Sequence, residues 1–289
     1  MVAPDLAHGG PRMQQWRNST AKRVAAAVAL PLVHAINRPA LSAFGRAVYD
    51  IALRFNGMAI TFKGKHGLTL SEENFLRQRL NVHDQGVMFD VGANEGAYAR
   101  RLRALCPAAQ IIAFEPHPAT FRTLAANCGG DAIELVNCAL GASEGQLELY
   151  DFADADGSTQ ASLSREAVSL FSANVVAHAV TVTTIDSYMH ERGVGEIALL
   201  KIDTEGRDLD VLRGAQAAIG RRAIAMIQFE FIPANVATRV FMRDFFAALP
   251  GYTLYRMCLN GDLLPLGEYD TKRCEIFVVQ NLIALRNEV

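Results

Sequence analysis

The fold of this chain is decided by one short stretch, FDVGANEG, which spans Phe89–Gly96. It overlaps a compact apolar run, Val87–Val91, and leads into the helical spacing of Glu95–Leu105. A compact apolar run of this length is typical of a buried parallel strand. The glycines Gly92 and Gly96 let the backbone turn tightly and approach a ligand without a Cβ in the way. The stretch therefore predicts a strand, a ligand-binding turn and a helix.

The alternation of strand and helix continues on the C-terminal side of that turn. Alternating elements of this length indicate an α/β fold with a doubly wound, mainly parallel sheet. The last two expected strands bracket a loop with Gly261 and could pair antiparallel. The strands expected after the first are Ile111–Phe114, Ile133–Asn137, Leu147–Phe152, Val180–Thr184, Ile197–Ile202, Ile224–Phe229, Tyr252–Met257 and Cys274–Val279, with helices at Pro118–Asn127, near 207–213 and at Thr238–Leu249.

The N-terminal part of the chain has a different pattern. Residues 1–85 are expected to form a mainly helical extension, and residues 86–289 the principal domain. Within the extension, Met58–Phe62 alternates apolar and polar residues as a short strand does. Ser71–Arg79 has the composition of a helix whose cap begins at Ser71.

Basic residues precede an apolar run near the N-terminus. Arg17, Lys22 and Arg23 come before Val24–Val33, which is too short to span a bilayer. Three interpretations stay open for residues 20–40. They form a helix that packs on the main domain or in a homo-oligomer, they make a peripheral contact with a membrane surface, or they are an export signal.

The composition narrows the class of protein. Of 289 residues, 51% are hydrophobic, which suffices for one sizeable core with an appendage. The net charge is -2 and no basic stripe is present, so nucleic acid is not an expected partner. The five cysteines form no CxxC pair, which argues against a disulfide framework or a zinc ribbon and favours the cytoplasm, with or without membrane association.

The glycine turn is the first candidate binding site. Ligands bind at the carboxyl edge of a parallel sheet, where this turn is expected to lie. Asp90 is placed to accept bonds from a cationic amino-acid group, directly or through water. A simple connection between strand and helix is the alternative. The cofactor-binding residues expected in the turn are Asp90, Gly92, Asn94, Glu95 and Gly96.

Two further strand ends suggest which ligand binds. Glu115 and Pro116 end the next strand, about two dozen residues past the first glycine. A carboxylate there can accept both hydroxyl groups of a ribose, which points to an adenosine ligand. Asn137 ends the third strand and either touches the adenine edge or only closes a turn.

Three acids at later strand ends suggest a reaction. Asp203 and Glu205 lie in LKIDTEG, and Glu230 ends the following strand. Two close carboxylates repel each other, so one can have a raised pKa and act as a general base. They could instead hold a divalent cation, bind a substrate hydroxyl, or stabilise a helix N-terminus by interacting with its dipole.

Taken in order, these segments resemble the FkbM-type methyltransferases. The resemblance runs from about Val87 to Gln280, and its most diagnostic part is the KIDTEG segment. It implies a Rossmann-like, seven-stranded sheet, mostly parallel, with one antiparallel strand near the C-terminal edge. Thr204 and the pair Arg207-Asp208 depart from the usual pattern, which leaves acceptor details open. The segments that carry the resemblance are FDVGANEG, AFEP, NCALG, TIDSY, LLKIDTEGRDLDVLRGA and QFEF.

The resemblance also implies an activity. It predicts S-adenosylmethionine as cofactor and methyl transfer to a hydroxyl of a sugar, polysaccharide or secondary-metabolite acceptor. Asp203 or Glu205 is the expected general base, and Glu230 a third acid near the acceptor. A divalent metal is not favoured and no metal ligand is assigned. A lid is expected at Ala153–Ser164, with a linker as its alternative.

Two other classes of protein compete with this reading. A nicotinamide-dependent oxidoreductase also has a glycine turn and a ribose acid, but its turn is Gly-x-Gly-x-x-Gly rather than Gly-x-Asn-x-Gly. A non-catalytic interaction protein on the same fold is the other alternative. The three acids argue against it, because a scaffold does not need them.

Overall fold

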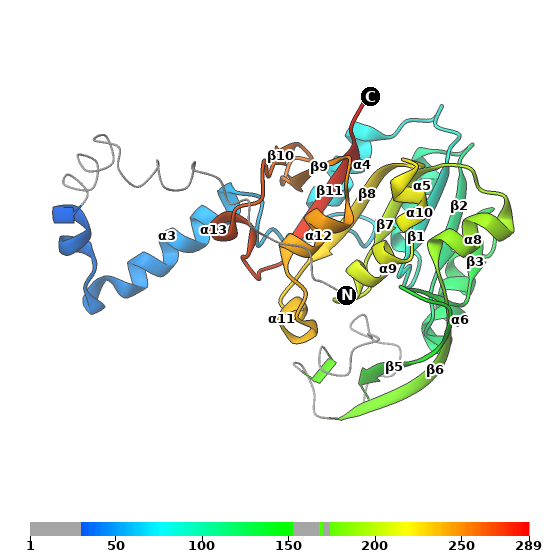
Figure 1. Ribbon diagram of the computed structural model, residues 1–289, viewed down its shortest axis with the longest axis horizontal. Coiled ribbons are helices and arrows are strands. Elements are labelled where there is room, and N and C mark those ends of the chain that lie inside the picture. The colour runs from blue at the N-terminus through cyan, green and yellow to red at the C-terminus, as the bar shows by residue number, and fades with distance from the viewer. Residues whose placement is uncertain (1–29, 153–167, 170–173, 289) are drawn as a thin grey trace, which may run out of the picture. The chain divides into compact units, whose positions relative to one another are not determined.

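The computed structural model describes residues 30–152, 168–169 and 174–288. The chain divides into two compact units, Met1–Ala52 and Leu53–Val289, and the second contains both sheets (Figure 1). The helices are η1 (Pro39–Leu41), α3 (Ser42–Phe55), α4 (Leu70–Arg79), α5 (Ala97–Leu105), α6 (Pro118–Cys128), α8 (Ile185–Arg192), α9 (Asp208–Arg213), α10 (Gln216–Gly220), α11 (Ala234–Thr238), α12 (Met242–Ala248) and α13 (Thr271–Cys274). The strands are β1 (Val87–Val91), β2 (Gln110–Phe114), β3 (Glu134–Val136), β4 (Ala139–Leu140), β5 (Gly145–Phe152), β6 (Val175–Thr183), β7 (Ile197–Ile202), β8 (Ile224–Phe231), β9 (Tyr252–Met257), β10 (Leu263–Pro265) and β11 (Gln280–Arg286).

The main sheet has the order β10-β9-β11-β8-β7-β1-β2-β3 (Figure 1). Strands β3, β2, β1, β7 and β8 are parallel, and β11 runs antiparallel to both of its neighbours, β8 and β9. The predicted Rossmann-like α/β fold, with a reversed strand near the C-terminal edge, is confirmed. The short strand β10 pairs with β9 and adds an eighth strand to the seven that were predicted.

The last strand lies further along the chain than the sequence predicted. Cys274–Val279 is not a strand, because Cys274 ends α13. The Asp270 carboxylate caps that helix by accepting the backbone N–H groups of Lys272 and Arg273. The strand that pairs with β8 and β9 is β11 instead, which places three fully buried apolar residues in the middle of the sheet.

A second, three-stranded sheet has the order β4-β6-β5. β5 and β6 pair antiparallel along their whole length, and β4 joins β6 in parallel. The predicted strand at Val180–Thr184 is the C-terminal part of β6, which begins at Val175. The segment predicted as a lid, Ala153–Ser164, lies outside the described residues.

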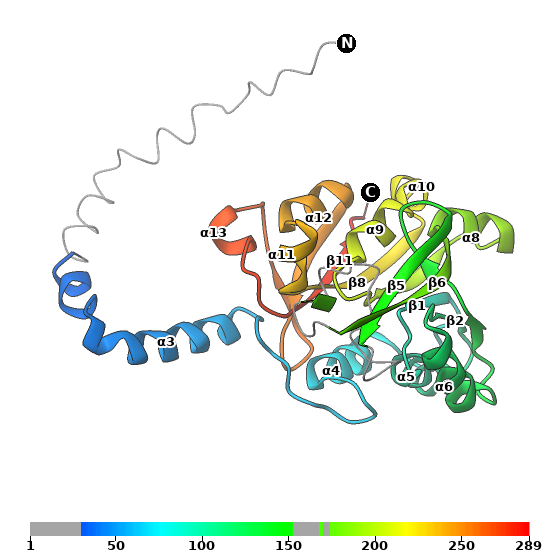
Figure 2. The ribbon, with the colours of Figure 1, turned by 90° about the horizontal axis from the view of Figure 1, so that it is seen from below.

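Helices cover both faces of the main sheet. Figure 2 shows α4, α5 and α6 along one side of the strands and α9, α10 and α12 along the other. Neighbouring strand residues alternate between the two layers, as the period of two requires. On β1, Met88 packs with the first group of helices, while Phe89 and Val91 pack with the second.

The segment before β1 belongs to the same compact unit as the sheets. Phe75 and Leu76 of α4 are fully buried in the core beneath α5. The cap of α4 is Thr69 rather than Ser71, because Thr69 and Glu72 exchange side-chain-to-backbone hydrogen bonds. The compact unit thus begins at Leu53, whereas the sequence placed the start of the principal domain at residue 86.

The predicted strand at Met58–Phe62 is wrong. Ala59 has a positive φ of 53°, and its N–H donates to the Val279 carbonyl at 2.9 Å, so the segment is irregular and bonded to the chain near β11. Further toward the N-terminus, the helical residues 30–36 and α3 confirm part of the helical extension. Within the ranges that the structure covers, no helix has the length and apolar character needed to cross a membrane.

Candidate active site

The turn after β1 is packed directly against the turn after β7. The backbone N–H of Asp203 donates to the Val91 carbonyl at 3.0 Å, and Gly92 follows with a φ of 75°. A Cβ on Gly92 would lie 1.9 Å from the carbonyl oxygen of Asp203, so no other residue fits there. Gly92 therefore lets the ends of β1 and β7 meet at one point.

The second glycine of the motif, Gly96, makes a different close contact. Gly96 has a φ of 86° at the start of α5, and a Cβ there would lie 2.3 Å from the Cys128 sulfur on α6. Gly96 does not line the cavity described below, so it allows α5 and α6 to pack closely. Asn94 and Glu95, between the two glycines, do line that cavity.

Glu115 is held rigidly at the end of β2. Its Oε2 accepts the Asn94 N–H at 3.0 Å, and its Oε1 accepts the His117 N–H at 2.8 Å. Burial raises the pKa of Glu115 to about 7, against the lowering effect of these two bonds. Glu115 and Pro116 both face the cavity, and each carboxylate oxygen keeps further acceptor capacity for a ligand hydroxyl.

Asn137 does not line the cavity. Its side-chain amide donates to the Glu115 carbonyl at 2.8 Å and to the Pro116 carbonyl at 3.2 Å. These contacts fit the turn-closing role that was the alternative in the sequence. The residues that follow it, Cys138 and Ala139, line the cavity instead.

A row of buried polar side chains crosses the sheet on the face that carries α4 and α5. Asp90 on β1 stands in register with Lys201 on β7, and Lys201 with Gln228 on β8. All three side chains are buried. Neither Lys201 nor Gln228 was predicted to have a role, although each interrupts an apolar strand.

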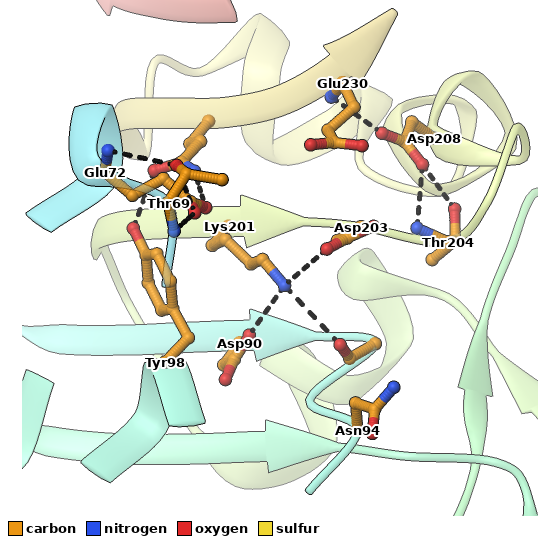
Figure 3. A network of polar contacts seen from close by, with 12 residues as sticks. Thr69, Glu72, Asp90, Asn94, Tyr98, Lys201, Asp203, Thr204, Asp208 and Glu230 are labelled. Atoms are coloured by element: carbon orange, nitrogen blue, oxygen red, sulfur yellow. Dashed lines mark hydrogen bonds and ion pairs between the residues drawn. The ribbon is translucent and has the colours of Figure 1, made fainter. Parts of the chain in front are cut away.

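Lys201 is the centre of this row. Its Nζ lies 3.4 Å from Asp90 Oδ1, 3.2 Å from Asp203 Oδ2 and 3.5 Å from the Gly92 carbonyl (Figure 3). Burial lowers the pKa of Lys201, but Asp203 and Asp90 outweigh burial and hold that pKa above its usual range. Burial raises the pKa of Asp90, which lies outside the cavity lining, behind Lys201. The ammonium group is therefore the fixed positive charge that ties the two turns together.

The row is completed by side chains from two helices. Tyr98 of α5 donates its hydroxyl to Gln228 Oε1 at 2.7 Å, and the Lys201 ammonium lies 5.3 Å from its ring centre (Figure 3). Glu72 of α4 accepts from Gln228 Nε2 at 3.0 Å and from the Thr69 hydroxyl at 2.7 Å. A wall of the site thus comes from the predicted N-terminal extension, where no motif was recognised.

Two of the predicted catalytic acids line the cavity. Asp203 is ion-paired with Lys201 and partly exposed, and Glu205 sits in the next turn with a φ of 51°. Burial raises the pKa of Glu205 to about 8, with Asp203 and Asp208 adding to the rise. The predicted pair of close carboxylates with one raised pKa fits this arrangement.

The third acid, Glu230, lies behind the cavity rather than in its lining. Burial, together with Asp203 and Glu205, raises its pKa well above the usual range. Its N–H donates to Asp208 Oδ2 at 2.9 Å, and Asp208 Oδ1 accepts the Thr204 hydroxyl at 2.6 Å (Figure 3). Asp208, which the sequence analysis noted only as a departure from the family pattern, joins the β7 turn to β8.

These elements enclose a cavity of about 400 Å³, within the range of small-molecule sites. Seven of the eleven predicted site residues line it, and four lie behind or beside it. The lining residues are Gly92, Asn94, Glu95, Glu115, Pro116, Asp203 and Glu205, and the others are Asp90, Gly96, Asn137 and Glu230. Around this site and elsewhere in the described ranges, no cluster of three or more His, Cys, Asp or Glu is arranged to hold a metal ion.

The family model for the methyltransferase FkbM domain matches residues 90–252, more than half of the chain. The chain belongs to the FkbM methyltransferase family. Membership of this family identifies an S-adenosylmethionine-dependent methyltransferase domain. The matched segment contains the glycine turn, Glu115, Lys201 and both cavity acids.

Individual relatives are distant in sequence. The AMB antimetabolite synthetase AmbE of Pseudomonas aeruginosa is 27% identical over 53% of this chain, which spans only 9% of that protein. The 2-O-methyltransferase NoeI of Sinorhizobium fredii is 26% identical over 54% of this chain and 75% of its own length. A crystal structure of methyltransferase FkbM from Methylobacillus flagellatus covers 74% of this chain and 47% of its own, with 16% identity and a TM-score of 0.44.

The residues of the cavity fit the cofactor of the family. Gly92 lines the cavity with backbone alone, and Glu115 presents a carboxylate to ribose hydroxyls. The sulfonium and ammonium groups of S-adenosylmethionine are cationic, and the lining is rich in carboxylates. Glu72 and Asp203 are placed to favour that charge.

Proposed function

We propose that this methyltransferase acts on oxygen and transfers the methyl group to a hydroxyl of a sugar, polysaccharide or secondary-metabolite acceptor. The observation that carries the proposal is that Asp203 and Glu205 line the same cavity as the glycine turn and Glu115. A hydroxyl needs a base to take its proton as it attacks, and carboxylates beside the cofactor can supply one. The name of the relative NoeI, a 2-O-methyltransferase, supports methylation of oxygen.

The protein's part in this reaction is positioning and proton transfer. S-adenosylmethionine supplies an activated methyl group on a sulfonium. The turns after β1 and β2 hold the nucleoside, and the turn after β7 aligns the acceptor oxygen with the methyl carbon. The acceptor proton passes to a carboxylate of that turn as the new oxygen–carbon bond forms. Such base catalysis typically accelerates the reaction by about 10²–10⁴-fold.

Asp203 and Glu205 are the two candidates for the base. With a pKa of about 8, Glu205 is largely protonated at neutral pH, and it becomes a base only as the pH rises. Asp203 is ion-paired with Lys201 and presents its carboxylate from the end of β7. A base at Glu205 therefore predicts a rate that climbs through about pH 8.

The test is methyl transfer from labelled S-adenosylmethionine to a panel of sugars, glycans and polyketide-type alcohols. Asp203→Asn and Glu205→Gln are compared with Glu268→Gln, an exposed acid outside the site. We expect one of the two site variants to lose about 10²-fold or more in kcat, with cofactor binding retained by calorimetry. Full turnover in both site variants, or methylation only at nitrogen or carbon, would overturn the proposal.

A further inference from the structure

Helix α3 carries a stripe of large apolar side chains that are exposed. Phe44, Val48, Ile51 and Phe55 are 69%, 48%, 50% and 82% exposed. Their spacing of four, three and four residues places them within about 60° of one another around a helix. They therefore form one continuous face of large side chains.

The stripe occupies one side of α3. Leu53, half a turn away from Phe44 around the axis, is 6% exposed. Arg46 and Asp50 also lie away from the stripe, so the helix has distinct apolar and polar sides. An exposed apolar face of this kind marks an interaction surface rather than a core contact.

Exposed apolar side chains are concentrated in this part of the molecule. Of the seventeen large apolar residues that are exposed among the described ranges, ten lie between residues 30 and 55. The other seven are scattered over the remaining described residues, from Phe62 to Tyr269, as is normal for a protein surface. The concentration is therefore a property of the N-terminal segment.

The charge of the same segment identifies what the stripe binds. Residues 1–56 contain seven Lys and Arg against two Asp and Glu, a net charge of +5, so residues 57–289 carry -7 of the total of -2. Arg38 precedes the stripe, and Arg46 and Arg54 lie between its first and last residues. A helix with an apolar face and basic flanks is the form that lies on an anionic bilayer.

We propose that α3 docks the enzyme on the surface of an anionic phospholipid bilayer, with the Phe44–Phe55 stripe in the boundary between head groups and acyl chains. The basic residues contact lipid phosphates, and the acidic remainder of the chain is repelled from the same surface. A second copy of this chain is a poorer partner, because pairing two stripes would bring two segments of charge +5 together. This inference does not depend on the acceptor or on the base.

The test is flotation of the full-length protein with vesicles of phosphatidylcholine alone and of phosphatidylcholine with phosphatidylglycerol. We expect roughly tenfold more protein to float with the anionic vesicles, and less as salt is raised. The double variant Val48→Glu/Ile51→Glu should lose this binding. The matched control, Val82→Glu/Val236→Glu, alters two apolar residues of similar exposure elsewhere and should keep it.

Three results would overturn the proposal. They are absence of flotation with anionic vesicles, equal flotation with neutral and anionic vesicles, and equal loss in the stripe and control variants. A dimer in light scattering that becomes a monomer in Val48→Glu/Ile51→Glu would assign the stripe to a second copy instead. Calorimetric titration with S-adenosylmethionine shows that each variant is folded, because no residue of the stripe lines the cavity.

Discussion

Replacing Lys201 with methionine removes the positive charge between the two turns of the site. Lys201 Nζ lies 3.4 Å from Asp90 Oδ1, and the two side chains are 6% and 0% exposed. Two unit charges at that distance attract by about 5 kcal/mol at an effective dielectric constant of about 20. Breaking a buried pair costs about 3–5 kcal/mol, because the remaining charge stays buried. The Asp203 pair adds less, since its carboxylate is 35% exposed and screened.

We therefore expect Lys201→Met to lower the free energy of unfolding by about 3–5 kcal/mol at pH 8. The loss should depend on pH, because burial already raises the pKa of Asp90 and removal of Lys201 raises it further. A carboxyl with a raised folded pKa contributes stability that is present below its unfolded pKa and is lost as pH rises through the folded pKa. The penalty should be smaller at pH 5, by up to about 1.4 kcal/mol for each pH unit.

The assay is urea unfolding followed by far-ultraviolet circular dichroism at pH 5 and pH 8. Lys272→Met, at an exposed position in α13, is the matched control. Asp90→Asn added to Lys201→Met should recover most of the loss, since it removes the stranded charge. The reasoning fails if Lys201→Met costs no more than the control, or if the cost is independent of pH and unaffected by Asp90→Asn.

Three further predictions follow from the turns around the cavity. Gly92→Ala should lower the stability measured in thermal melts by about 2–4 kcal/mol and abolish cofactor binding. The reason is that its Cβ would lie 1.9 Å from the Asp203 carbonyl oxygen. A Gly92→Ala variant that binds the cofactor normally would contradict this prediction. Glu115→Gln should weaken the binding of S-adenosylmethionine, measured by calorimetry, by about 10–100-fold. It removes a carboxylate oxygen that accepts hydrogen bonds and also orders the turn. An unchanged Kd would show that Glu115 does not contact the ligand. Burial raises the pKa of Asp208 to about 6, so up to about 3 kcal/mol of stability present below its unfolded pKa should be lost by pH 8; urea unfolding that shows a gain over this range would refute that sign.

The sequence located the buried parallel strands well and the last strand poorly. The predicted bounds of β1, β7 and β9 match the structure, because each is a compact run ended by turn residues. The run at Cys274–Val279 is equally apolar, yet β11 contains Gln280 and Asn281 instead. Gln280 can be buried there because its side chain accepts from Arg256 Nε at 2.7 Å. That partner is 24 residues away in sequence, so no local pattern indicates it.

The residues at the strand ends of the site could be predicted from the sequence. The side chains that support them could not, because they depend on the register between strands. Gly92, Glu115, Asp203 and Glu205 were predicted to lie together because parallel strands end at one edge of the sheet, and they line one cavity. The row that supports them depends on Lys201 standing opposite Asp90, which is a matter of pairing between strands 111 residues apart. A lone polar residue in each apolar strand was a usable signal, but it does not reveal its partners.

Two parts of the chain line the cavity, and this division bears on which acceptor the enzyme selects. The turns after β1, β2 and β7 that line the cavity lie within the matched segment 90–252, whereas Gly67, Leu68 and Glu72 line it from outside that segment. The bond from Glu72 to Gln228, with the burial of α4 in the core, fixes this wall against the sheet. Reactions shared by a family require the shared turns, while a wall outside them is free to differ in shape and charge. The segment before β1 is therefore a part of the cavity wall whose shape and charge can vary outside the turns that the family shares.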